Sequence, residues 1–119
     1  MSFTRASSIV YKDLQDHESL TTLLSKGKES VYPLLASETE ADNFVNYYIQ
    51  DTGKASKEAS RFEVVVRSYA ESYDLCCQIA DKVTESFKAS NNYYTNLGGR
   101  PYANGEGWFY IEQKFTIKI

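Results

Sequence analysis

The sequence predicts a two-layer α+β sandwich, an antiparallel sheet of about 4–5 strands with its helices on one face. Two patterns carry this prediction. Residues 61–67, Arg-Phe-Glu-Val-Val-Val-Arg, alternate as a strand does, and the apolar residues from Tyr69 to Phe87 then recur at spacings of three and four. The last residues, 108–119, alternate again. A strand that leads into an amphipathic helix and is followed by another strand indicates a sheet covered on one side.

The amino-terminal region predicts a helix on the same face of the sheet. Residues 4–15 place Ala6, Ile9, Val10 and Leu14 at helical spacing. Leucines 20, 23 and 24 extend the helical pattern by a turn or two, and Gly27 is expected to stop it.

Three further strands are expected, two before the long helix and one after it. Residues 31–35 predict a short edge strand, because Pro33 cannot donate to a ladder, and residues 43–50 alternate and should pair with 61–67. Residues 93–97 predict a further strand that ends at a Gly98-Gly99 bend.

The start of the long helix is predicted from a capping box. Ser68 precedes Glu71 by three residues, so the Ser68 hydroxyl is expected to accept from a first-turn amide while the Glu71 carboxylate reaches back. The helix is therefore expected over about residues 69–88.

Length and composition favour one domain, residues 1–119, in a reducing compartment. The net charge is −3, and residues 1–60 carry nine acids against six bases, which is the wrong sign for sequence-neutral binding to nucleic acid. The two cysteines, Cys76 and Cys77, are neighbours and cannot bridge each other. The first residues do not resemble a secretion signal, and no window is apolar enough for a membrane span.

The residues predict neither catalysis nor a cofactor. A hydrolase would have to combine His17, the only histidine, with Cys76 or Cys77, which the helix pattern assigns to packing. The acids of 38–42 lack the remainder of a calcium loop, and no zinc ligand set is present. We therefore expect no enzyme activity, no metal and no cofactor.

Aromatic residues are the remaining signal. The chain has ten tyrosines, six phenylalanines and one tryptophan, and several fall on surfaces assigned to solvent. Such side chains either cover the second face of the sheet or form an interface. An alternative function is a small α+β binding module with a pocket or peptide groove made by Tyr48, Trp108 and Tyr110.

Two segments carry a resemblance to a known family. Leu20-Thr-Thr-Leu-Leu24 is followed by Gly27 and Val31-Tyr-Pro, and Val64-Val-Val-Arg-Ser-Tyr-Ala-Glu-Ser-Tyr-Asp74 enters the long helix. In this order, with a terminal strand, the chain resembles the tail-completion proteins of long-tailed bacteriophages, within the tail-terminator and head-tail joining group. The likeness covers most of the chain.

This resemblance implies a structural protein of the virion, made in the host cytoplasm. It implies a ring, usually of six copies, that ends the tail tube and joins it to the head connector. Its partners would be itself, the tail-tube protein and the connector protein, while DNA passes through without specific binding and no membrane is involved. Candidate interface residues for the ring or a partner are Val31, Tyr32, Tyr48, Tyr93, Tyr94, Tyr102, Trp108 and Tyr110.

Overall fold

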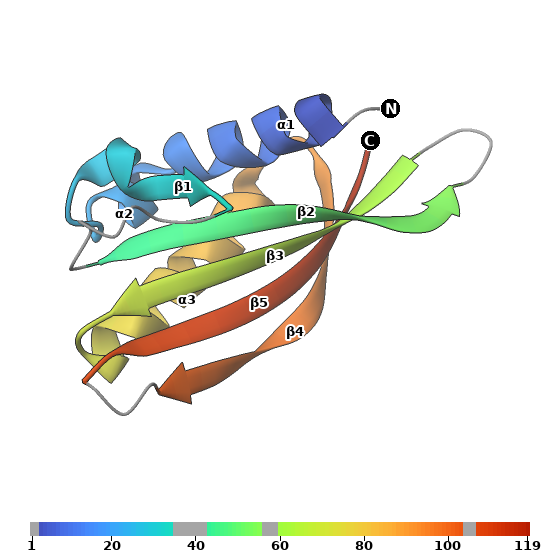
Figure 1. Ribbon diagram of the computed structural model, residues 1–119. Coiled ribbons are helices and arrows are strands. Elements are labelled where there is room, and N and C mark those ends of the chain that lie inside the picture. Colours follow the sequence, from blue (N-terminus) through green and yellow to red (C-terminus); the bar gives the residue numbers. More distant parts are fainter. Residues whose placement is uncertain (1–2, 35–42, 56–59, 104–106) are drawn as a thin grey trace.

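The computed structural model describes residues 3–34, 43–55, 60–103 and 107–119, and its helices and sheet form two layers (Figure 1). The predicted α+β fold class is confirmed. The helical elements are α1 (Phe3–Gln15), α2 (Glu18–Thr21), the 3₁₀ helix η1 (Gly27–Ser30) and α3 (Tyr73–Ala89). The strands are β1 (Val31–Pro33), β2 (Phe44–Ala55), β3 (Ser60–Ala70), β4 (Tyr93–Ala103) and β5 (Phe109–Lys118).

The five strands lie in the order β1-β2-β3-β5-β4. β2, β3, β5 and β4 pair antiparallel, as predicted, whereas β1 runs parallel to β2. The expected pairing of residues 43–50 with 61–67 is confirmed, with Tyr47 opposite Val66. β1 is a short edge strand, as expected, and β4 forms the other edge.

The core lies between the helices and one face of the sheet. β3 contributes Phe62, Val64 and Val66, the predicted apolar face of that strand, and β5 contributes Phe115 and Ile117. From the helices come Ala6, Val10, Leu14, Cys76, Ile79, Val83 and Phe87. α1 packs on β1 and β2 while α3 packs on β3 and β5, so all the long helices described lie on the same face.

The predicted start of the long helix is wrong by about one turn. β3 continues through Ser68 to Ala70, and α3 begins at Tyr73 with Ser72 as its N-cap. The Ser72 hydroxyl accepts from the Leu75 amide at 3.3 Å. Ser68 is instead buried in the strand, because the apolar face of β3 extends to Ala70 and packing under α3 outweighs the local capping pattern.

The predicted bend at Gly98-Gly99 is also wrong. β4 continues through both glycines. Its register with β5 shifts between Asn96 and Gly98. Leu97 is the extra residue of this bulge, and Gly98 adopts a φ of +101°, which only glycine tolerates readily. The glycines therefore absorb a β-bulge in place of a hairpin turn.

Candidate interaction surface

One face of the sheet is covered by no helix in the described part of the chain; we call it the open face. Alternation along each strand selects its residues, because paired residues point to the same side. Across β2, β3, β5 and β4 the register gives successive rows, such as Asn46, Arg67, Glu112 and Arg100. The predicted solvent face of the last strand, with Tyr110, Glu112, Lys114, Thr116 and Lys118, belongs to this face.

Five aromatic rings cross the open face in one line, which we call the aromatic row: Tyr32, Phe44, Tyr69, Tyr110 and Tyr102. Each strand supplies one ring. The register places Phe44 opposite Tyr69, Tyr69 opposite Tyr110, and Tyr110 opposite Tyr102. Their ring centroids are 4.6, 5.0 and 4.8 Å apart, and Tyr32 contacts Phe44 edge to face at 6.1 Å.

The spacing in the aromatic row shows how the rings stand. Distances of 4.6–5.0 Å with interplanar angles of 14–26° match the separation of neighbouring strands, about 4.8 Å. The rings therefore stack on one another along the direction of the strand hydrogen bonds and stand up from the sheet. They present their edges outward, while their faces are already taken up by neighbouring rings.

Positive charge gathers beside the aromatic row. The charged residues of the open face are the bases Arg61, Arg67, Arg100, Lys114 and Lys118 and the acids Glu63 and Glu112. A face with five bases and two acids contrasts with a chain whose net charge is −3. Arg67 Nε donates to Glu112 Oε2 at 2.9 Å, and the Arg100 guanidinium lies 4.7 Å from the centre of the Tyr102 ring. Burial opposes the charge of Arg67, but the hydrogen bond to Glu112 outweighs it and raises the pKa of Arg67, so the guanidinium stays charged.

Five of the candidate interface residues lie on the open face. Tyr32, Tyr102 and Tyr110 belong to the aromatic row. Tyr48 lies two rows further on, opposite Val65, and its ring centre is 5.6 Å from the Arg67 guanidinium. Tyr93, opposite Lys118, lies at the far end of the same face and is exposed.

The other candidates lie elsewhere. Val31 is 1% exposed, so proposing its side chain as an interface contact was wrong; it faces the helices and belongs to the core. Tyr94 also points to the helix side, where its ring stacks on Phe87 at 4.1 Å. Trp108 is half-buried just before β5.

Sequence reasoning missed Phe44, Tyr69 and the arginines as parts of this surface. Tyr69 was assigned to the helix by the capping pattern at Ser68, although the alternation of 61–67 continued to it. The expected bend at Gly98-Gly99 would have ended the strand before Arg100, so the sequence did not place Arg100 on the sheet. Extending the period of two across residues 68–70 would have placed Tyr69 beside Arg67.

A second polar region joins the helices. Asp13 Oδ2 accepts from the Tyr94 hydroxyl at 2.6 Å, from Ser90 Oγ at 2.8 Å and from Asn92 Nδ2 at 3.1 Å. These bonds tie the end of α1 to the connection between α3 and β4. A hollow of about 370 Å³ beside them is lined by residues at the ends of α1 and α3 and in that connection, together with Asp16 and His17.

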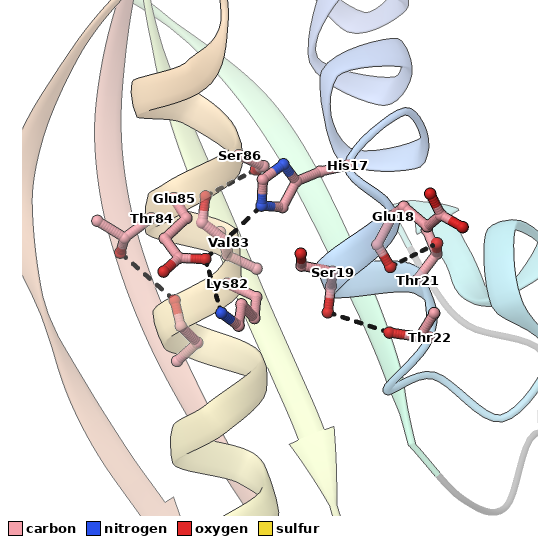
Figure 2. A network of polar contacts seen from close by, with 11 residues as sticks. His17, Glu18, Ser19, Thr21, Thr22, Lys82, Val83, Thr84, Glu85 and Ser86 are labelled. Carbon is pink, nitrogen blue, oxygen red and sulfur yellow. Dashed lines mark hydrogen bonds and ion pairs between the residues drawn. The ribbon is translucent and has the colours of Figure 1, made fainter.

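His17, which also lines this hollow, faces α3 (Figure 2). Its Nε2 is 3.7 Å from Glu85 Oε2, and the same carboxylate oxygen is 2.9 Å from Lys82 Nζ. The hydrogen bond from Lys82 lowers the pKa of Glu85, and His17 adds a smaller effect in the same direction. His17 thus contacts α3 near its carboxyl end.

The structure separates the groups of the hydrolase hypothesis. Cys76 lies nine residues before Glu85 on α3, which is about 13 Å of helical rise from the residue that His17 contacts. Cys76 is fully buried, its Sγ donates to the Ser68 carbonyl at 3.1 Å, and burial raises the pKa of its thiol to about 11. A Cys76 thiolate activated by His17 is incompatible with this placement.

The aromatic pocket expected for a small binding module does not form from Tyr48, Trp108 and Tyr110. Tyr48 lines a hollow of about 220 Å³ together with residues of α1 and β1, to which Trp108 and Tyr110 do not contribute. Tyr110 is enclosed between Tyr69 and Tyr102. The open face is a broad side of the sheet on which Tyr48, Trp108 and Tyr110 do not come together as a pocket, so it suits a macromolecule better than a small ligand.

The described ranges offer neither a metal site nor a membrane span. They contain no group of three or more acidic, histidine or cysteine residues placed to hold a metal ion. The acids of 38–42 lie outside those ranges. None of the helices described has the length and apolar character of a membrane span.

Comparison with known proteins identifies the fold through structure. Comparison with protein families gives no match, and comparison with curated protein sequences gives none either. Among solved structures, the chain is similar to one from the virion of a native gene transfer agent (GTA) particle, with a TM-score of 0.71 and 15% identity. The match covers 98% of each chain, so the two share a fold over their whole length.

Proposed function

We propose that this protein is a structural component of a phage-like virion and that it forms a ring at the head-tail interface. The observation that carries the proposal is the full-length likeness in fold to a chain of a virion, with 98% coverage of both chains. The resemblance of residues 20–34 and 64–74 to phage tail-completion proteins supports it independently. In this role the ring ends the tail tube and joins it to the head connector, without chemistry of its own.

The shape of the molecule suits such a role. A ring of identical subunits needs two different surfaces on each copy, one for each neighbour. The described part of the chain has a helical layer on one side and the open face on the other, and the aromatic row provides area that a partner can bury. Its partners in this proposal are further copies of itself, the tail-tube protein and the connector protein.

Deleting the gene in the virus or strain that encodes it tests the role. Negative-stain microscopy of the resulting particles should show tails that are not joined to heads, and restoring the gene on a plasmid should reverse the defect. Tail tubes of widely varying length would identify a tail terminator, whereas unattached tails of normal length would identify a connector-side joining protein. Intact particles of normal yield and tail length would refute the proposal.

A further inference from the structure

The open face carries more bases than acids, whereas one stretch on the helical side carries acids alone. On the open face, five bases stand against two acids. On the helical side, Glu71 lies in the turn before α3, and Asp74 and Asp81 lie on the first half of α3. Residues 71–81 contain no base, and Lys82 follows directly. All three carboxylates are exposed. We call these three residues the acidic stripe.

The two aspartates of the acidic stripe point away from the sheet. The buried side of α3 includes Cys76, Ile79, Ala80 and Val83, so Asp74 and Asp81, seven residues apart and near one helical phase, fall on the opposite side. Each copy therefore presents a basic surface on one side and an acidic one on the other.

The open face is large enough to cover the acidic stripe. At about 4.8 Å per strand and about 3.3 Å per residue, five strands and the ten residues of β5 span about 20 Å by 30 Å. The 17 residues of α3 extend about 25 Å. The projected area of about 600 Å² approaches the roughly 800 Å² that each partner contributes to a standard interface.

Nucleic acid is a poorer fit to the open face. A sheet that binds single strands offers the faces of its aromatic rings to the bases. Here the faces of Phe44, Tyr69, Tyr110 and Tyr102 are occupied by one another, and Arg67 is already paired with Glu112. An acidic protein surface needs only the ring edges, the hydroxyl groups and the cations.

We propose that the open face of one copy packs against the acidic stripe of the next copy, so that copies associate head to tail. The partner is a second copy because both complementary surfaces belong to the same chain and lie on opposite sides of it. Such contacts are heterologous and close into a ring when the rotation between copies permits. Only the closure of these contacts into a ring rests on the proposed function; the contact between two copies does not.

Charge reversal tests the pairing of these surfaces. One variant changes the open face, Arg100→Glu with Lys114→Glu, and a second changes the stripe, Glu71→Lys with Asp81→Lys; all four side chains are exposed. The matched control, Lys12→Glu with Lys28→Glu, repeats the charge change of the first variant on exposed residues outside both surfaces. Circular dichroism confirms that each variant is folded.

Sedimentation velocity over a range of protein concentrations measures association. We expect the unchanged protein and the matched control to associate, and each reversed variant to associate more than about tenfold more weakly, because like charges then face each other. A mixture of the two reversed variants should restore association, since each basic surface again meets an acidic one. The variant that combines all four substitutions should associate with itself for the same reason.

Other results would overturn the inference. Association that survives both reversals places the contact elsewhere and leaves the proposed function standing, because gene deletion tests that separately. Failure of the mixture to associate means that the open face does not meet the acidic stripe, and an unchanged protein that stays monomeric at every concentration means that no such contact forms. Fluorescence anisotropy with a short DNA duplex tests nucleic acid as the alternative occupant. If the monomer binds the duplex and the open-face variant does not, nucleic acid occupies the open face and the inference is overturned.

Discussion

Arg67 and Glu112 face each other across β3 and β5, with 2.9 Å between Arg67 Nε and Glu112 Oε2. The pair lies in the row next to the aromatic row, and its side chains keep 32% and 19% of their exposure. Partial exposure lets water screen the charges, so the pair contributes modestly to the stability of the monomer.

Replacing Arg67 and Glu112 with alanine, singly and together, measures this contribution. We expect a coupling energy of about 0.5–1.5 kcal/mol from urea unfolding, between the values for exposed pairs and for charged hydrogen bonds. The coupling should fall as salt is added. Additive effects of the two substitutions would show that the pair does not stabilise the fold.

Asp13 is expected to matter more for stability than any other acid at the end of α1. Its Oδ2 accepts from Tyr94, Ser90 and Asn92, so Asp13→Ala leaves these three donors without their acceptor. We expect a loss of about 2–3 kcal/mol in urea unfolding and faster amide exchange at the start of β4. Exposed Asp16 provides the control, since Asp16→Ala should change the unfolding free energy by less than about 0.5 kcal/mol.

The Asp13 prediction has a further check in Tyr94. Burial, and then the hydrogen bond to Asp13, raises the pKa of the Tyr94 phenol above its ordinary value of 10.0. Tyr94→Phe removes one of the three bonds and should cost less than Asp13→Ala. Equal losses would mean that Ser90 and Asn92 contribute nothing.

The buried Cys76 thiol leads us to expect that the unfolding free energy falls at alkaline pH. Burial raises the pKa of its thiol from 9.0 to about 11, so the folded state holds this proton more tightly than the unfolded chain. The contribution is complete below pH 9 and disappears as the pH rises towards about 11. Cys76→Ala should therefore flatten the decline of the unfolding free energy over that interval.

Cys77→Ala is the matched control for this measurement and should keep most of the decline, because burial is the largest cause of the raised Cys76 pKa and the neighbouring Cys77 a smaller one. The pKa of Tyr47 and that of Tyr94 are raised as well, but both variants retain those tyrosines, so only the difference in slope reports on Cys76. At about pH 8 a thiol reagent should label Cys77, which is partly exposed, and spare Cys76. An unchanged slope in Cys76→Ala, or labelling of both thiols in the native protein, would contradict the assignment.

Periodicity along the chain predicted the two layers because it reports directly which side chains are buried. The alternation of Phe62, Val64 and Val66 and the stripe of α3 reflect a core that every compact arrangement of this sequence must form. The exact junction was missed because Ser68 and Ser72 both precede a helix-forming segment, and only the packing of Ala70 under the helical layer decides between them.

The candidate surface was predictable in part. Tyr102 and Tyr110 were recognised as aromatic residues on solvent-facing positions, but their alignment with Phe44 and Tyr69 depends on the register of four strands. A shift of one residue in any pair would send a ring to the other face. Sequence alone does not fix that register, so the row became visible only with the fold.

Gly99 is the residue on which the course of β4 depends. A Cβ added there would lie 2.7 Å from the Glu112 carbonyl oxygen and 3.0 Å from Gln113 Cγ, so β4 and β5 would have to move apart. We expect Gly99→Ala to cost about 1–3 kcal/mol in urea unfolding and to speed amide exchange along β4, whereas Thr95→Ala on the same strand should be nearly neutral. If Gly99→Ala were as stable as the unchanged protein, β4 would not run against β5 at this point. The chain would then turn at the two glycines, and Arg100 and Tyr102 would leave the open face.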